Sequence, residues 1–334
     1  MVDMTQSSVA LNASRVSDPR GDSAPQGVSA PQGGDKIFHA LCFSAAMVLM
    51  ATLAGLLIAL LVGGWPALSH FGLAFFTSST WDPVADNYGA AGPIAGTLIT
   101  AFIAMLLAMP LAIGVAVFLV EFCPKALAYY VGLAVELLAG IPSIVYGMWG
   151  LFVLAPWFAM HVQMPLMVAV TPGSLLDRIF AGVPNGANIF TASLILAIMV
   201  LPYIATVFRE LLLSVPPHVR EAAYGMGATP FEVVRSIMLP YIRRSAIGAV
   251  MLGLGRALGE TMAVTFIIGN SHAFPKSLFD SGSTLASTIA NEFTEATGDM
   301  HISALIALGL VLFLITFAAL AAARLLLGRG EVVA

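Results

Sequence analysis

Three ionisable side chains interrupt otherwise apolar stretches of this chain: Glu136, Arg256 and Glu260. A charge inside an apolar stretch is costly to bury, so it normally finds a partner or lines a polar cavity. Arg256 and Glu260 are four residues apart, which on a helix predicts a shared face and a direct ion pair. The planar guanidinium of Arg256 could instead bind an oxyanion through two hydrogen bonds. Both roles, structural pair and binding group, are open at this point.

Glu136 has no charged neighbour within the same apolar stretch. A lone carboxylate repels an anion, so we expect Glu136 to pair with Arg256, to pair with the arginine that corresponds to Arg256 on another subunit, or to form a gating contact.

Other kinds of chemistry find no support in the sequence. The six histidines and two cysteines are scattered without metal-ligand spacing. None of the three lysines follows a glycine, so the phosphate-binding loop of ATPases is absent. The small net charge of −4 gives no basis for a nucleic-acid partner. We therefore predict a non-catalytic chain without cofactor or metal.

The surroundings of these charges indicate a membrane protein. The chain is 59% hydrophobic and 10% charged, whereas soluble domains are about one quarter charged. Six apolar runs are long enough to cross a hydrocarbon core of about 30 Å. They are Ile37–Val62, Pro93–Val120, Ala128–Phe152, Ile189–Leu213, Ala246–Ile268 and Ile302–Leu327.

The distribution of basic residues predicts the orientation. With both termini in the cytoplasm, only Arg178 and Lys276 of the 14 basic residues fall in outer loops, and Arg256 lies in a span. Cytoplasmic loops collect Lys and Arg, so we expect a multi-pass inner-membrane protein with both ends inside. Residues 36–328 form the predicted all-α membrane domain. Residues 1–34, rich in Ser, Pro, Gly and Gln, are predicted to be a disordered tail, and 329–334 a short C-terminal tail.

The cytoplasmic loop 214–244, between the fourth and fifth spans, has its own helical pattern. Val219, Ala222, Ala223 and Met226 have the spacing of one helix face, and Gly225 and Gly227 interrupt it. Thr229-Pro230-Phe231-Glu232 predicts a second helix that starts with a capping box. Two short helices bent at glycine would suit a groove on a soluble partner.

The same loop resembles a known motif. Glu221, Ala222 and Ala223, followed by Gly227 and then by Ile237 and Leu239-Pro240, are similar to the EAA loop of ABC importer permeases. The resemblance implies that Glu221, Ala222, Ala223 and Gly227 dock into a cleft on an ATPase subunit, which binds ATP and Mg²⁺. It also implies the type I importer permease fold.

Two further stretches resemble a narrower family. Gly140–Phe152 and Gly253–Asn270 are similar to the PstC family, the permeases of phosphate-specific ABC importers. The resemblance implies a sister permease as heterodimer partner, two copies of a cytoplasmic ATPase, an extracytoplasmic phosphate-binding protein, and phosphate as cargo moving through the bilayer. It also implies a transport role for the pair that matches Arg256 and Glu260.

Two alternatives remain from the residues alone. An ABC permease for another oxyanion, such as sulfate or molybdate, would share the EAA loop. An ion-coupled secondary transporter could use Glu136, Arg256 and Glu260 as a relay, but the loop has no counterpart in the first half of the chain.

Overall fold

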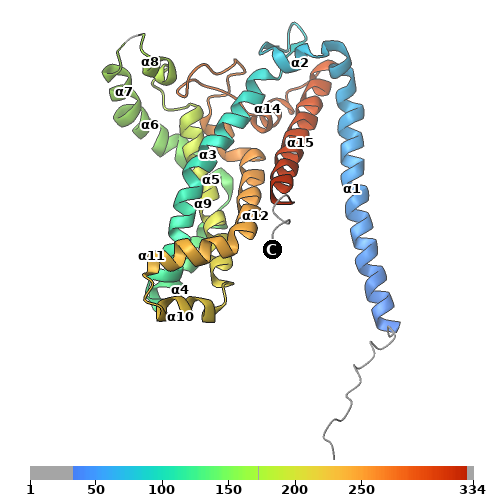
Figure 1. Ribbon diagram of the computed structural model, residues 1–334. Coiled ribbons are helices and arrows are strands. Elements are labelled where there is room, and N and C mark those ends of the chain that lie inside the picture. Colours follow the sequence, from blue (N-terminus) through green and yellow to red (C-terminus); the bar gives the residue numbers. More distant parts are fainter. Residues whose placement is uncertain (1–32, 172, 329–334) are drawn as a thin grey trace, which may run out of the picture. The chain divides into compact units, whose positions relative to one another are not determined.

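The computed structural model describes residues 33–171 and 173–328, and it is mostly helical (Figure 1). The predicted tails therefore lie outside the described residues, except that the first helix already begins at Gly33. The chain divides into two units within this helix, after Gly55. Residues 33–55 are a regular helix, and the following paragraphs concern the second unit, which begins at Leu56.

The elements of the first half, where η marks a π-helical turn, are α1 (Gly33–Phe71), α2 (Ala74–Thr77), β1 (Trp81–Asp82), β2 (Asn87–Tyr88), α3 (Ala91–Val117), η1 (Phe118–Phe122), α4 (Lys125–Ala139), α5 (Ser143–Trp149), η2 (Gly150–Leu154), α6 (Ala155–Phe158), η3 (Ala159–Gln163) and α7 (Met164–Ala169). Those of the second half are α8 (Leu175–Phe180), α9 (Ile189–Leu213), α10 (Pro217–Gly225), α11 (Pro230–Val233), η4 (Val234–Met238), α12 (Leu239–Leu258), α13 (Met262–Ile267), α14 (Leu285–Glu292) and α15 (Asp299–Gly328).

Six helical stretches among the described residues are long and apolar enough to cross a membrane, which confirms the number predicted from hydropathy. The fourth predicted run, Ile189–Leu213, coincides with α9. The sixth, Ile302–Leu327, lies within α15.

The third predicted span, Ala128–Phe152, is wrong as a continuous helix. α4 ends at Ala139, Gly140 caps it, and α5 begins only at Ser143. Pro142 has no backbone N–H and disfavours a helical conformation at the preceding residue, so the helix breaks there. The candidate span instead runs from Ser143 to Ala169.

The fifth predicted span, Ala246–Ile268, is displaced for a related reason. Its helix runs from Pro230 to Leu258, so the second helix of the predicted loop is the start of the span rather than a separate short helix. Gly259 ends α12, and the chain resumes as α13 at Met262.

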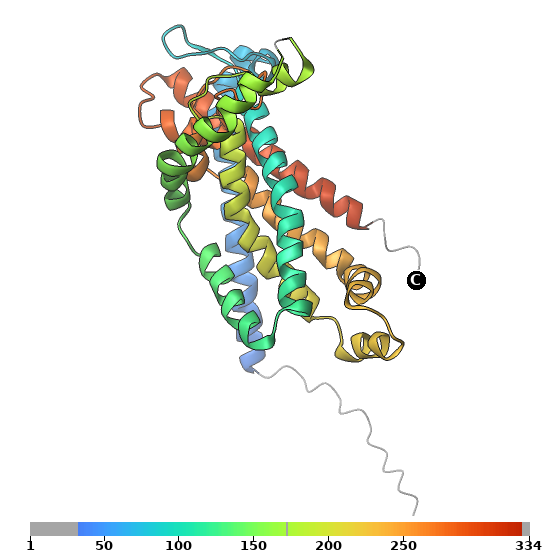
Figure 2. The same cartoon turned by 90° about the vertical axis from the view of Figure 1, so that its left-hand side faces the viewer.

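α9 is the centre of the bundle and packs between α3 and α12 (Figures 1 and 2). Its side chains Ile195, Leu196, Val200 and Ile204 are fully buried. α3 faces the same core with five buried alanines, at positions 101, 104, 108, 112 and 116. Alanines at this spacing form a narrow stripe that lets the two helices approach closely.

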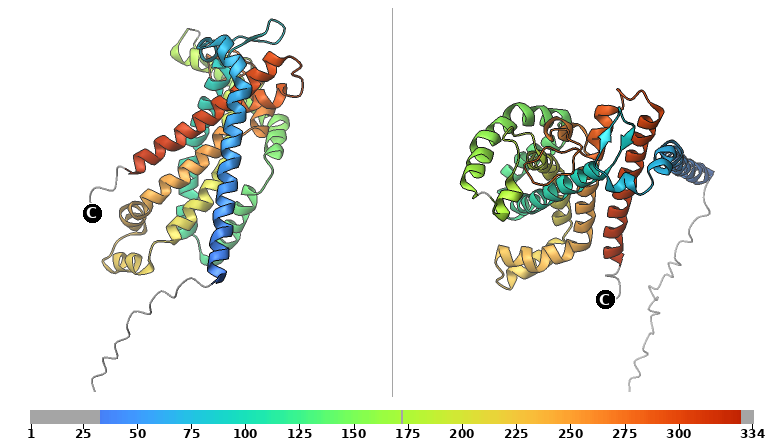
Figure 3. Two further views of the ribbon diagram at one scale, coloured as in Figure 1. Left: turned by 90° about the vertical axis from the view of Figure 1, so that its right-hand side faces the viewer. Right: turned by 90° about the horizontal axis from the view of Figure 1, so that it is seen from above.

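The second unit has two ends with different structures. The loop end consists of the η1–α4 junction (118–125) and of α10 and α11 (Figure 2). The cap end consists of residues 72–90, with the antiparallel β1–β2 pair, and of residues 270–298, with α14. Figure 3, seen from above, shows the β1–β2 hairpin beside the first turns of α15.

Candidate docking helix and membrane-interior site

The motif residues of the loop lie on and after α10. Ala223 is buried, whereas Glu221, Ala222 and Gly227 are exposed. Gly227 has a φ of +88°, a left-handed conformation that suits glycine and ends the helix. The predicted capping box of α11 is present: the Thr229 hydroxyl accepts the Glu232 N–H, and the Glu232 carboxylate accepts the Thr229 N–H.

The predicted apolar face of α10 divides between the core and the solvent. Ala223 packs into the core and Val219 is half-buried, but Ala222 is exposed and Met226 is 83% exposed. The exposed face is therefore formed by His218, Glu221, Ala222 and Gly225, with Met226 just beyond the helix. This face can receive a partner.

The sequence analysis missed the residue that holds the other face of α10. Glu121, in η1, accepts hydrogen bonds from Arg220 on one oxygen and from the Tyr224 hydroxyl on the other, the latter at 2.8 Å. Burial of Tyr224 and its bond to Glu121 raise the pKa of its phenol above the ordinary value. A glutamate at the end of an apolar run was the only local signal, because Arg220 follows 99 residues later.

Arg256 and Glu260 do not form the predicted ion pair within the described part of the chain. The helix ends at Leu258, so the two residues no longer share a helix face. Glu260 instead accepts the backbone N–H of Ala263 at the start of α13, at 3.2 Å. The guanidinium of Arg256 lies 5.7 Å from the centre of the Tyr203 ring, and its buried Nε has no hydrogen-bond partner.

Two broken helices meet beside Arg256. α5, which follows the break at Pro142, packs closely on α13, because a Cβ at Gly147 would lie 3.0 Å from the Cα of Ala263. The Tyr146 hydroxyl reaches across the break to the carbonyl of Leu138 at 2.9 Å. Helix breaks at membrane depth expose backbone polar groups and are tolerated where protein or a polar cavity covers them.

Glu136 pairs with Arg209, so Arg256, one of the partners expected for it, is not its partner among the described residues. The distance between Glu136 Oε1 and Arg209 Nη1 is 3.4 Å, and the same nitrogen lies 3.3 Å from Glu210. Arg209 lies near the end of the fourth predicted run, Ile189–Leu213, which coincides with α9, and α9 packs on α4. Glu136 therefore belongs to the loop side of the bundle.

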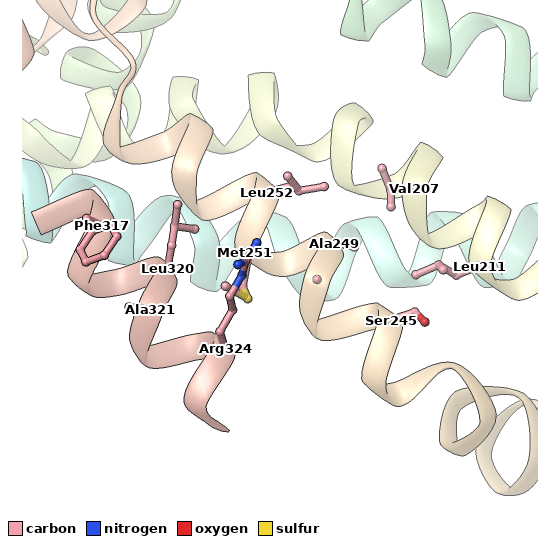
Figure 4. Close-up of a pocket in the computed structure, with 11 residues that line it drawn as sticks. Val207, Leu211, Ser245, Ala249, Met251, Leu252, Phe317, Leu320, Ala321 and Arg324 are labelled. Atoms are coloured by element: carbon pink, nitrogen blue, oxygen red, sulfur yellow. The ribbon is translucent and has the colours of Figure 1, made fainter. Parts of the chain in front are cut away.

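A large pocket of about 750 Å³ lies between α9, α12 and α15 (Figure 4). Its walls are apolar, except for Ser245 and Arg324. Only these two side chains could replace the water of a hydrated anion, so the pocket is better suited to apolar groups than to an anion.

The cap end holds a second carboxylate that the sequence analysis did not single out. Glu292 accepts hydrogen bonds from Trp81 Nε1 at 2.6 Å and binds His301 and His272 at 2.9 and 3.1 Å. Trp81 stacks on His272, and Tyr88 on His301. Burial alone would raise the pKa of the Glu292 carboxyl, but its hydrogen bonds outweigh burial and lower the pKa below the usual range. Burial and the Asp86 carboxylate raise the pKa of Tyr88 to about 12.

Comparisons with known proteins agree with this architecture. Residues 91–329 match the family model of the binding-protein-dependent transport system inner membrane component. A Mesorhizobium japonicum protein called phosphate transport system permease protein PstC is 53% identical over 88% of this chain and 90% of its own length. Its Haemophilus influenzae namesake is 51% identical over 86% of this chain and 90% of its own length. This chain belongs to the PstC permease family.

A solved structure shares the fold of this permease at low sequence identity. It is a bacterial alginate ABC transporter in complex with an alginate-bound periplasmic protein, with a TM-score of 0.57 and 15% identity. The match covers 87% of this chain and 93% of that one. Family and spans together make the chain a non-catalytic, multi-pass inner-membrane subunit with the ABC importer permease fold.

Proposed function

We propose that this chain is the pore subunit of an ATP-driven importer of inorganic phosphate. The assignment of phosphate as cargo rests on the 53% identity to a relative called phosphate transport system permease. The chain would pair with a sister permease and receive phosphate from an extracytoplasmic binding protein. Two ATPase subunits, which bind ATP and Mg²⁺, would supply the energy.

The docking point for the ATPase is the exposed face of α10. Glu221 and Ala222 lie on this face, and Gly227 sets the direction in which the chain leaves the helix. An ATPase in the cytoplasm puts the loop end inside, with both chain termini on the same side, as the basic residues predict. Closure of the ATPases on ATP would shift α10 and open the pore outward, and hydrolysis would reset it.

Arg256 is the residue that would meet phosphate inside the membrane. Its guanidinium has no ion-pair partner among the described residues, and its Nε is buried without a hydrogen bond. An unpaired guanidinium beside two helix breaks offers an oxyanion charge and directed N–H groups where water is scarce. Glu260 and Glu136 are engaged elsewhere, so neither neutralises it.

The docking proposal is tested by a matched pair of glycine variants. Gly227→Leu forces a branched side chain into a left-handed conformation, whereas Gly227→Asn places there a residue that tolerates this conformation, and the space around Gly227 is open. We expect Gly227→Leu to abolish radiolabelled phosphate uptake in a deletion strain and to loosen ATPase co-purification, with membrane insertion unchanged. Gly227→Asn should retain most of both activities. Normal co-purification with Gly227→Leu would contradict docking.

The role of Arg256 is tested by Arg256→Gln and Arg256→Lys. Loss of a charge-assisted hydrogen bond is worth about 1.5–3 kcal/mol, so we expect Arg256→Gln to lower phosphate uptake about tenfold or more. Arg256→Lys keeps the charge but loses the planar guanidinium, so its phosphate uptake should lie between that of the wild type and that of Arg256→Gln. Both variants should still assemble with the sister permease and ATPase. Failure of the variants to assemble would give Arg256 a structural role instead. If sulfate or molybdate, but not unlabelled phosphate, competed with uptake, the assignment of phosphate as cargo would be wrong.

A further inference from the structure

The loop end contains a buried carboxylate that transport, as described so far, does not use. The side chain of Glu121 is only 5% exposed, and both of its oxygens are engaged by α10. Arg220 and Tyr224 are four residues apart, so they lie one helical turn from each other on the same face. A buried charge is stable only when it is paired and hydrogen-bonded. Glu121 therefore holds α10 firmly against η1.

The two faces of α10 have different partners. Ala223 is buried and Arg220 half-buried on the side of the bundle, where the 39% exposed Tyr224 bonds to Glu121, while His218, Glu221 and Ala222 are exposed on the opposite face. A protein that grips the exposed face and moves α10 would therefore pull on Glu121 through the other face.

Glu121 is joined to the cap end by one continuous helical stretch. It follows α3 directly, and the 27 residues of α3 span about 40 Å at 1.5 Å per residue. The alanine stripe of α3 packs against fully buried side chains of α9, among them Leu196 and Val200. Close-packed elements of this kind move as rigid bodies rather than deform.

The far end of α3 is bonded to the segment that begins α14. Thr97 Oγ1 accepts the backbone N–H of Leu285 at 2.9 Å. At Gly96 the fit is so close that a Cβ would lie 2.0 Å from the carbonyl oxygen of Ser283. A displacement of α3 along its axis is therefore passed to residues 283–285 and to α14.

We propose that Glu121 is the coupling residue through which displacement of α10 is transmitted to α3 and, by α3, to the cap end. This inference rests on the proposed ATP-driven import and specifies how the motor moves the gate. Glu121 touches no cargo, so it is a positioning residue. Its loss disconnects ATP hydrolysis from transport.

The test uses the complete transporter with its ATPase, reconstituted in proteoliposomes. We expect Glu121→Gln to retain ATPase co-purification and ATP hydrolysis while phosphate transported per ATP falls about tenfold, within the usual range of coupling energies. Glu210→Gln is the matched control, because Glu210 is an exposed glutamate on the neighbouring helix. It should leave the ratio unchanged. An unchanged ratio in Glu121→Gln would overturn the proposal, as would an equal loss of hydrolysis and transport.

A covalent crosslink between positions 121 and 220 should restore the coupling that is lost with Glu121. In a background with Cys42 and Cys123 replaced by serine, Glu121→Cys with Arg220→Cys should be uncoupled until a short thiol crosslinker joins the two positions. Recovery of transport per ATP on crosslinking supports transmission, and no recovery counts against it.

Hydrogen exchange separates this proposal from the choice of cargo. ATP should change amide exchange in residues 283–292 of the wild-type complex but not of Glu121→Gln, whether or not phosphate is present. If the wild type shows this response yet transports no phosphate, the cargo proposal fails and the coupling proposal stands. If ATP leaves residues 283–292 of the wild type unchanged, or changes them equally in both proteins, the coupling proposal fails.

Discussion

Each end of the bundle holds one glutamate, Glu121 at the loop end and Glu292 at the cap end. The side chains that bind the two glutamates differ in chemistry. At the loop end, Glu121 is bound by a guanidinium and a phenol from one helix, α10. At the cap end, Glu292 is bound by an indole and two imidazoles from three separate segments. A guanidinium stays charged at every physiological pH, whereas imidazoles do not. The loop end thus keeps its cation at every physiological pH and ties two elements together, whereas the cap end brings three segments to one carboxylate.

The strongest way to break the loop-end joint is to remove the cation. Arg220→Ala leaves a buried carboxylate without its charged partner, at a cost of about 3 kcal/mol. We expect α10 to become accessible to proteases, while the spans insert normally. Limited proteolysis of the purified permease measures this. Arg235→Ala, at an exposed arginine without an ion pair among the described residues, should have no such effect.

Acid should weaken the contacts that Glu292 makes at the cap end. The folded-state pKa of Glu292 lies below its unfolded value, so the carboxylate stabilises the fold above the ordinary carboxyl pKa of about 4.3. This stabilisation is lost as pH falls through the lowered folded-state pKa. Glu292→Gln should cost about 2 kcal/mol at neutral pH, because three donors then share one neutral oxygen.

The measurement is the difference in thermal unfolding midpoint between wild type and Glu292→Gln as a function of pH. It should shrink as the pH falls below about 4. A difference that grows on acidification would contradict the assignment of Glu292 as the charged centre of the cap.

The smallest effect is expected for Tyr224→Phe. The variant loses one hydrogen bond to Glu121 on a partly exposed side chain, worth about 1 kcal/mol or less, and keeps the Arg220 pair. Because the pKa of Tyr224 is raised, its hydroxyl stays protonated at neutral pH and the effect should not vary between pH 6 and 8. Hydrogen exchange of α10 measures it. An effect as large as that of Arg220→Ala would mean that the phenol, not the guanidinium, holds the joint.

The sequence predicted the spans better than their interruptions. Hydropathy alone identifies six crossings, because each depends on a local run of apolar residues. Pro142 and Gly259 were visible, but prolines 110 and 202 lie inside continuous helices, so the residue type did not say which span would break. The capping box at Thr229 was predicted correctly because it depends on four consecutive residues.

By itself the sequence determined the membrane class, the number of spans and the capping box in the loop 214–244, since these follow from the identities and spacing of neighbouring residues. Only the tertiary structure decided which charges meet. In it, Glu136 pairs with Arg209, Glu121 with Arg220 and Glu292 with two histidines. Arg256 has no ion-pair partner among the described residues. Pairing depends on distances of a few ångströms between segments far apart in the chain, and helix packing alone sets those distances.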